Sequence, residues 1–277
     1  ISTPIGNLED MSPRAIKVLQ NVQLIAAEDT RTARNLLNHL GLWPLSKSCE
    51  LMSYFQGNEQ YRSTQIVDKL ISGADGALLS EAGTPSISDP GHILIRQAIE
   101  KGIKIQVIPG ANAVIAALVG SGLATDRFLF LGFPPRQEKA RQELFSSLRS
   151  EPGTLIFYEA PSRIIETLKE LALYLGENRQ ACVARELTKL YEEYIRGTIS
   201  EVLSYCQDKP PRGEITLLIA GSTADWSSFT IDLDQEIQQR LKDGQGAKEI
   251  AAYLSIVTGK SRHALYQLIL LKKQHLD

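Results

Sequence analysis

The chain has 277 residues, of which 43% are hydrophobic and 22% charged, a composition that is typical of globular domains and excludes a disordered or fibrous chain. Its formal net charge of -2 excludes a polycation that holds nucleic acid over its whole surface, so an RNA partner would need a local basic patch. The cysteines, Cys49, Cys182 and Cys206, are far apart and lack metal-binding spacing, which favours reduced thiols in a cytoplasmic protein.

The start of the chain and its longest apolar run carry expectations of their own. The run over 114–124 is broken by Gly120, Ser121 and Gly122 and is shorter than the roughly 20 residues that span a bilayer. The chain does not open on a charged segment followed by an apolar one, so neither secretion nor membrane insertion is expected. Residues 3–7 form a turn-like segment that usually follows a buried strand, so we expect a short strand upstream of Ile1.

The first 122 residues alternate between short apolar runs and amphipathic segments. Ser12 and Pro13 predict the N-cap and first position of a helix, and Gly41 predicts the end of another over 30–40. Further helices are expected over 60–72, 93–101 and 111–119, and strands over 23–27, 77–80 and 103–108. Strands separated by helices predict crossover connections and a largely parallel sheet in an N-terminal α/β domain, residues 1–122.

A second α/β domain is expected over 123–221, built on a mixed sheet. Its predicted strands are 127–131, 154–158, 180–185, 192–197 and 214–220, and its predicted helices are 138–149 and 164–175. A polar linker over 222–230 then leads to about three short helices, which form a small helical unit over 231–277.

Three loops of small residues are the first candidates for a ligand site. They are residues 3–10, 79–91 and 107–113, and the last two come directly after expected strands. Ligands bind at the carboxyl edge of open α/β sheets, so loops on parallel strands would meet there. The alternative is that each loop is only a connection, with Asp89 capping the helix after it. Fingerprints of phosphate-binding and dinucleotide-binding loops are absent, and four dispersed histidines give no metal site.

Two charged clusters are candidates for acid–base chemistry, because each follows an apolar strand. Residues 27–34 contain Glu28, Asp29, Arg31 and Arg34, and residues 184–193 contain Arg185, Glu186 and Lys189. Both have a simpler interpretation as solvated ion pairs, and Asp29 is equally suited to cap a helix that begins at Thr30.

Five segments together resemble one family. They are Thr3-Pro4-Ile5-Gly6-Asn7-Leu8-Glu9-Asp10, Ala27-Glu28-Asp29-Thr30-Arg31, residues 80–91 with Ser80-Glu81-Ala82-Gly83-Thr84-Pro85, Pro109-Gly110, and Arg185-Glu186-Leu187-Thr188-Lys189 with Arg212-Gly213-Glu214. They resemble the tetrapyrrole-methylase superfamily over nearly the whole chain, and within it the bacterial branch that methylates the ribose 2′-oxygen of a cytidine in 16S ribosomal RNA.

The resemblance implies two α/β domains with S-adenosylmethionine in the cleft between them, commonly in a homodimer, and the small ribosomal subunit as partner. The residues that it implies for cofactor binding are Pro4, Ala82, Gly83, Thr84, Ile87, Asn112, Ala113, Tyr158, Glu159 and Gly197. An uncharged wall of Gly, Ala and Thr suits adenosine and a sulfonium better than a triphosphate.

The chemistry requires an aligned ribose oxygen and removal of its proton. We expect Asp29, Glu186 and Lys189 to supply these roles, with Lys189 as the cation that stabilises the developing alkoxide. Arg31, Arg34 and Arg185 are expected to position phosphates, with surface ion pairs as the alternative. Lys260 and Arg262 make the C-terminal unit locally basic, so we expect it to contact RNA. The alternative is that this unit only caps the second domain.

Two other functions compete with methylation of ribosomal RNA. One is a methyltransferase that acts on a tetrapyrrole precursor, and the other is a non-catalytic RNA-binding factor in ribosome assembly. The Thr3-Pro4-Ile5-Gly6-Asn7 opening and the helical C-terminal unit favour the RNA enzyme over the first, and the presence of both charged clusters favours it over the second.

Overall fold

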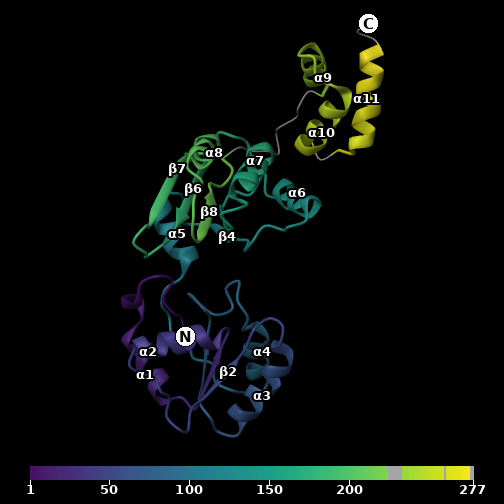
Figure 1. Ribbon diagram of the computed structural model, residues 1–277. Helices are drawn as coiled ribbons and strands as arrows, with labels where there is room; N and C mark the ends of the chain where they lie inside the picture. Colours follow the sequence, from purple (N-terminus) through teal and green to yellow (C-terminus); the bar gives the residue numbers. More distant parts are fainter. Residues whose placement is uncertain (224–232, 259, 275–277) are drawn as a thin grey trace. The chain divides into compact units, whose positions relative to one another are not determined.

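The computed structural model describes residues 1–223, 233–258 and 260–274 and has the predicted α/β architecture with a helical C-terminal region (Figure 1). The chain forms two compact units. The first consists of Ile1–Gly122, Ala184–Tyr194 and Gly213–Thr216, and the second of Leu123–Val183, Ile195–Arg212 and Leu217–Asp277. Two short segments from the second half of the sequence therefore belong to the first unit.

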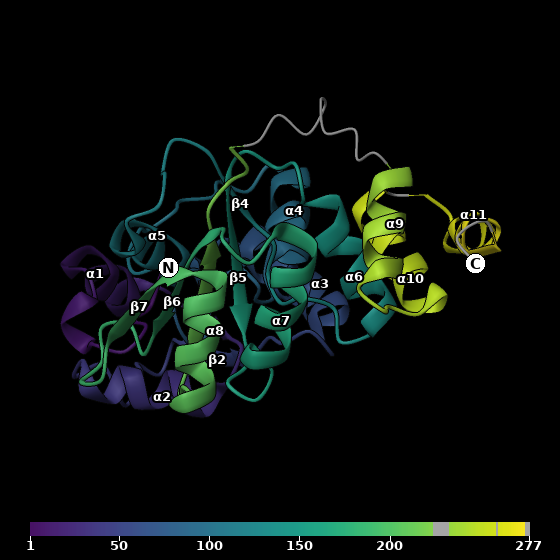
Figure 2. The ribbon, with the colours of Figure 1, turned by 90° about the horizontal axis from the view of Figure 1, so that it is seen from above.

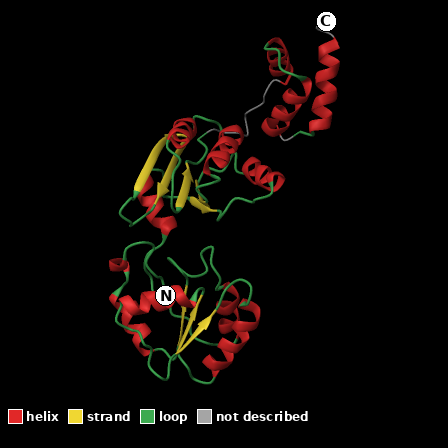
Figure 3. Cartoon of the chain, in the orientation of Figure 1, coloured by secondary structure: helices red, strands yellow, loops and turns green. Residues whose placement is uncertain are grey.

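The first unit is built on a three-stranded sheet whose strands run parallel, as predicted (Figure 3, yellow arrows). Its strands β1 (Leu24–Ala27), β2 (Glu50–Ser53) and β3 (Gly76–Leu79) have the order β2-β1-β3. Both neighbours pair with β1 in parallel, with Ala27 opposite Ser53 and Leu79. All four residues of β1 are buried, which fits a central strand. The carboxyl ends of the three strands therefore meet at one edge.

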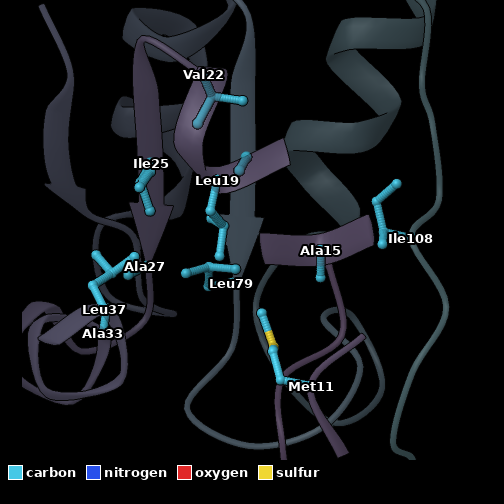
Figure 4. Packing of buried hydrophobic residues seen from close by; sticks show 11 residues of the cluster. Met11, Ala15, Leu19, Val22, Ile25, Ala27, Ala33, Leu37, Leu79 and Ile108 are labelled. Carbon is cyan, nitrogen blue, oxygen red and sulfur yellow. The ribbon is translucent and has the colours of Figure 1, made fainter. Parts of the chain in front are cut away.

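Side-chain caps mark the start of three helices of this unit, α1 (Pro13–Asn21), α2 (Thr30–His39) and α5 (Ala113–Ser121). Helix α1 begins with Ser12 as N-cap and Pro13 at its first position, as predicted. Helix α2 is followed by α3 (Glu59–Ile71), α4 (His92–Glu100) and α5, and a short 3-10 helix, η1, spans Leu8–Asp10. The interior is apolar: Ala15 and Leu19 of α1 pack with Ile25 of β1 and Leu79 of β3 (Figure 4).

Two sequence expectations fail in this unit. The predicted strand over 103–108 is wrong, because these residues are not a strand of either sheet that the described residues form. Residues 104–107 are exposed. The carbonyl of Ile108 accepts a hydrogen bond from the Ser2 amide at 3.1 Å. A strand needs a neighbouring ladder, which apolar alternation cannot supply. Strand β2, which the sequence analysis did not predict, occupies the open edge of β1 instead.

The second sheet has five strands in the order β4-β5-β8-β6-β7, and all five were predicted to within two residues at each end. They are β4 (Phe128–Phe130), β5 (Thr154–Glu159), β6 (Gln180–Arg185), β7 (Glu193–Thr198) and β8 (Ile215–Ile219). Helices α6 (Glu138–Ser147) and α7 (Ile164–Leu175) were also predicted. Helix α8 (Ile199–Asp208) was missed, although the capping box of Thr198 and Glu201 marks its start. Helices α7 and α8 lie side by side (Figure 2).

The C-terminal region contains the three predicted helices. They are α9 (Leu233–Lys242), α10 (Ala247–Thr258) and α11 (Arg262–Gln274). They share a core to which each helix contributes, including Ile237, Leu254 and Ile269. Most of the predicted linker over 222–230 lies outside the described residues. None of the described helices combines the length and apolarity needed to cross a bilayer.

Candidate functional site

Three loops of the first unit converge beside the carboxyl end of β3. The Thr3 amide donates to the Gly83 carbonyl at 2.8 Å, and the Gly83 amide donates back to the Thr3 carbonyl at 3.1 Å. Thr84 Oγ1 donates to the Ala111 carbonyl at 3.2 Å and lies 3.0 Å from Ser2 Oγ. The opening loop, the loop after β3 and the loop before α5 are thus held together by neutral groups.

Glycine is required at this junction. Gly83 has a φ of +81°, a left-handed conformation that favours glycine, and a Cβ there would lie 3.2 Å from Ile5 Cγ2. A Cβ on Gly110 would lie 3.0 Å from Ser2 Cβ. In the same loop as Gly83, the hydroxyl oxygen of Ser86 is buried and has no hydrogen-bond partner among the described residues. The junction is therefore small, uncharged and closely packed at its base.

Of the residues expected to bind the cofactor, seven lie in these loops and three in the second unit. Pro4 follows Thr3, and Ala82, Gly83, Thr84 and Ile87 lie in the loop after β3. Asn112 and Ala113 begin α5, where Asn112 Oδ1 accepts from the amides of Val114 at 3.0 Å and Ile115 at 3.3 Å. That oxygen is committed to capping the helix.

The three residues in the second unit occupy sheet positions. Tyr158 packs edge-on against Phe130, with ring centroids 5.0 Å apart. The Glu159 side chain is fully buried and accepts from Thr167 Oγ1 at 2.5 Å and the Ala160 amide at 2.8 Å. A Cβ on Gly197 would lie 2.7 Å from Glu201 Oε2, the carboxylate of the α8 capping box.

Asp29 is the N-cap of α2, which confirms the capping interpretation. Its Oδ1 accepts from the Arg31 amide at 2.6 Å, and its Oδ2 pairs with Arg31 Nη2 at 2.6 Å. The hydrogen bonds from the Arg31 side chain and backbone lower the pKa of Asp29 to about 2. Such a carboxylate is a weak base, so Asp29 is better suited to orient Arg31, whose side chain is 88% exposed, than to accept a proton.

Two more carboxyl groups, those of Glu28 and Asp89, influence each other at this edge. The Glu28 amide donates to the Leu79 carbonyl at 3.3 Å, and Glu28 Oε2 accepts from the Glu81 amide at 3.4 Å. Burial raises the pKa of Glu28. Burial and then the charge of Glu28 raise the pKa of Asp89 to about 6. The interpretation of Asp89 as a helix cap is wrong, because the N-cap of α4 is Gly91 and no side chain caps this helix.

Replacing Asp89 by asparagine is expected to stabilise the fold at pH 7.5. The carboxyl pKa is about 6 in the folded chain and lower in the unfolded chain, so the ionised group costs stability, increasingly as the pH rises from 4 through 6. With solvent screening allowed for, Asp89→Asn should gain about 1 kcal/mol at pH 7.5 and nothing near pH 4. Urea denaturation at the two pH values measures this, and a loss of stability at pH 7.5 would refute it.

The second charged cluster is tied together by Lys189. Its Nζ lies 2.9 Å from Glu186 Oε1 and 2.8 Å from Glu214 Oε2, and the Glu214 amide donates to Glu186 Oε1 at 3.0 Å. Burial opposes the charge on Lys189, but the hydrogen bonds to Glu214 and Glu186 outweigh it and raise the pKa. Bonds from the Glu214 amide and Lys189 lower the pKa of Glu186. Lys189 therefore stays a cation, as a group that stabilises an alkoxide must.

This cluster lies against the opening loop within the first unit. The Asn7 amide donates to Thr188 Oγ1 at 3.1 Å. A Cβ on Gly6 would clash with Lys189 Cγ and would lie 2.8 Å from Thr188 Oγ1. The backbone is strained here, since Glu186 and Thr188 have φ values of +51° and +64°. The structure thus brings Lys189 and the opening loop together.

The remaining predicted residues lie in other surroundings. Arg34 stacks on Trp43, with its Cζ 4.9 Å from the ring centroid, and Arg185 Nε pairs with Glu193 Oε2 at 2.6 Å. Lys260 and Arg262 are exposed in the C-terminal region. In the part of the chain that the structure describes, no three His, Cys, Asp or Glu side chains are placed to hold a metal ion.

Comparison with known sequences identifies relatives along nearly the whole chain. The profile of the family Tetrapyrrole (Corrin/Porphyrin) Methylases matches residues 1–203. A protein of Synechocystis sp. named "Ribosomal RNA small subunit methyltransferase I" is 44% identical over 272 residues, which are 98% of this chain and 96% of that protein. A protein of the same name from Streptococcus pyogenes serotype M1 is 42% identical, over 96% of this chain and 92% of that protein.

Solved structures share the fold at low sequence identity. A diphthine synthase matches with a TM-score of 0.59 and 13% identity, over 83% of this chain and 91% of that one. The methyltransferase CobJ matches with a TM-score of 0.58 and 15% identity, over 80% of this chain and 92% of that one. At this level of identity, the likeness concerns the fold alone.

Proposed function

Because the chain belongs to the tetrapyrrole (corrin/porphyrin) methylase family, we propose that it uses S-adenosylmethionine to methylate the ribose 2′-oxygen of a cytidine in small-subunit (16S) ribosomal RNA. The proposal of a ribosomal RNA substrate rests on the likeness, over 98% of the chain, to a relative named for small-subunit RNA methylation. The proposal of S-adenosylmethionine as cofactor is supported by the convergence of the three small-residue loops.

The loops of the first unit fit a nucleoside-like cofactor. Gly83 and Gly110 bring backbone close to backbone, Thr84 supplies a hydroxyl, and no charged side chain takes part in the bonds that join the loops. We propose that Pro4, Ala82, Gly83, Thr84, Ile87, Asn112 and Ala113 bind the cofactor from the first unit, and that Tyr158, Glu159 and Gly197 are the cofactor-binding residues of the second unit.

S-adenosylmethionine supplies an electrophilic methyl group on a sulfonium. The chain's residues must therefore align a ribose hydroxyl and remove its proton. We assign Lys189 to the developing negative charge on the oxygen, Glu186 to holding Lys189, and Asp29 to orienting Arg31 toward a phosphate. Asp89, whose pKa is about 6, is better matched than Asp29 to accept a proton near neutral pH.

A paired assay tests the proposal. The purified chain is mixed with S-adenosylmethionine, and its thermal stabilisation and its methyl transfer to isolated small ribosomal subunits and to tetrapyrrole precursors are measured. Stabilisation together with transfer to small subunits is expected. Transfer to a tetrapyrrole, or binding to subunits without any transfer, would instead support one of the two competing functions.

We further propose that Lys260 and Arg262 contact RNA phosphates from the C-terminal helices. Both are exposed, whereas Lys272 is paired with Asp234 at 2.9 Å. The double substitution Lys260→Glu and Arg262→Glu should weaken binding to small subunits and lower the slope of log affinity against log salt by about 2. Lys242→Glu, at the end of α9, is the matched control. A slope equal to that of the wild type would exclude these phosphate contacts.

A further inference from the structure

We propose that the ring of Phe55 is a stacking platform for a nucleobase of the RNA substrate, at the sheet edge that carries Glu28, Asp29 and Arg31. This inference rests on the proposed function and adds to it a place where a base is held. The platform belongs wholly to the first unit.

Strand register places Phe55 beside the charged edge. Ala27 is opposite Ser53, and the Tyr54 amide donates to the Ala27 carbonyl at 2.7 Å. Phe55 comes two residues after the end of β2 and Asp29 two residues after the end of β1, so the loops that carry them leave the same edge of the parallel sheet from neighbouring strands. Glu28, in turn, is bonded to Leu79 at the end of β3, where the loop with Gly83 begins. The loop with Phe55 and the loop with Gly83 thus follow the two strands that flank β1.

The ring is held in place by its own turn. Tyr54 is fully buried and its hydroxyl lies 3.1 Å from Ser63 Oγ, so the chain is anchored immediately before Phe55. The Phe55 amide donates to Asn58 Oδ1 at 2.9 Å, and Asn58 Nδ2 donates to the Ser53 carbonyl at 3.3 Å. A Cβ on Gly57 would lie 2.8 Å from Phe55 Cε2, so the ring rests against that glycine.

The surroundings favour a nucleobase over an apolar protein segment. Phe55 remains 46% exposed although it is held, which leaves part of its surface open to a ligand. The loop after β1, at the same edge, carries Glu28, Asp29 and Arg31, and the Arg31 side chain is 88% exposed. A base stacks on a single aromatic ring while its phosphate binds a guanidinium, and RNA-binding proteins recognise splayed-out bases in this way. An apolar peptide would instead have to bury these charges.

The test measures methyl transfer to small ribosomal subunits as a function of subunit concentration, with cofactor affinity measured by calorimetry. Phe55→Ala should raise KM for subunits about tenfold, in line with the loss of one stacked base, and leave the Kd for S-adenosylmethionine unchanged. Phe55→Tyr keeps the ring and should behave as the wild type. Gly57→Ala keeps Phe55 but displaces its ring, and should raise KM as well. Ile71→Ala, which removes a 57% exposed side chain at the other end of α3, should change nothing.

The outcomes separate the platform from the proposed function. An active wild type with an unchanged KM for Phe55→Ala would overturn the platform alone. So would equal losses for Phe55→Tyr and Phe55→Ala, or a parallel loss of cofactor affinity, because either would indicate a structural role. A wild type that binds the cofactor but transfers no methyl group to subunits would overturn the proposed function and, with it, RNA as the occupant.

Discussion

Replacing Lys189 by alanine is expected to lower the rate of methyl transfer about 100-fold, while the Kd for S-adenosylmethionine stays within a factor of three. A decrease in rate of this size is expected when one group that stabilises a developing oxyanion is lost. The hydrogen bonds from Lys189 to Glu214 and Glu186 raise the pKa of Lys189, so this side chain stays charged near neutral pH. The measurement is single-turnover transfer to small subunits, with cofactor affinity determined in parallel.

The same substitution also breaks two ion pairs, so a structural effect must be separated from a catalytic one. Lys189→Arg preserves the charge and both carboxylate partners and should recover most of the rate. The melting temperatures of Lys189→Ala and the wild type are compared in the same buffer. Unchanged turnover in Lys189→Ala would remove this residue from the mechanism, and a rate loss matched by unfolding would make it a structural one.

Replacing Arg141 by methionine is expected to lower the free energy of unfolding by about 3 kcal/mol. The Arg141 side chain is 4% exposed and forks onto Glu170, from Nε to Oε2 at 2.7 Å and from Nη2 to Oε1 at 2.6 Å. Nη2 also lies 2.6 Å from Glu166 Oε1, and Nη1 donates to the Arg136 carbonyl at 3.2 Å. Methionine fills similar space but leaves the 17% exposed Glu170 without a counter-charge, the costly way to break a buried pair.

Urea denaturation followed by circular dichroism measures the change, and α6 itself provides the control. Lys139 is 84% exposed and its Nζ is 3.9 Å from Glu143, so Lys139→Met should alter the stability by less than about 0.5 kcal/mol. A similar, small effect for Arg141→Met would show that the guanidinium contributes no more than a surface ion pair does.

Local signals in the sequence were sufficient for most of the fold. Ser12 with Pro13 marks the start of α1, and the fully apolar run of β1 marks a central strand. The two strand errors share one physical cause, because strand formation depends on partners far away in sequence, whereas α8 was missed although its capping box is local. Residues 103–108 have the pattern of a strand but lack a ladder, whereas β2 is half polar and is a strand because β1 pairs with it.

The site was predictable in its loops and less so in its chemistry. Gly83 and the opening loop were candidates from their small residues alone. Asp89 was missed, because the proximity of Glu28 and the burial that raises its pKa depend on how the loop after β3 folds back toward β1. Phe55 was missed because its turn follows β2, the strand that was not predicted. The loop with Asp89 was already a candidate, so an acidic residue within it was the available signal, whereas the loop with Phe55 was not assigned to a sheet edge at all.

The identity of the methylated nucleoside decides whether the chain catalyses the proposed reaction. Small subunits that lack the modification are incubated with the chain and isotopically labelled S-adenosylmethionine, and the RNA is digested to nucleosides and separated by mass. The account predicts that the label is found in 2′-O-methylcytidine from the small-subunit RNA. Label on a base, on another nucleoside or nowhere in the RNA would contradict it.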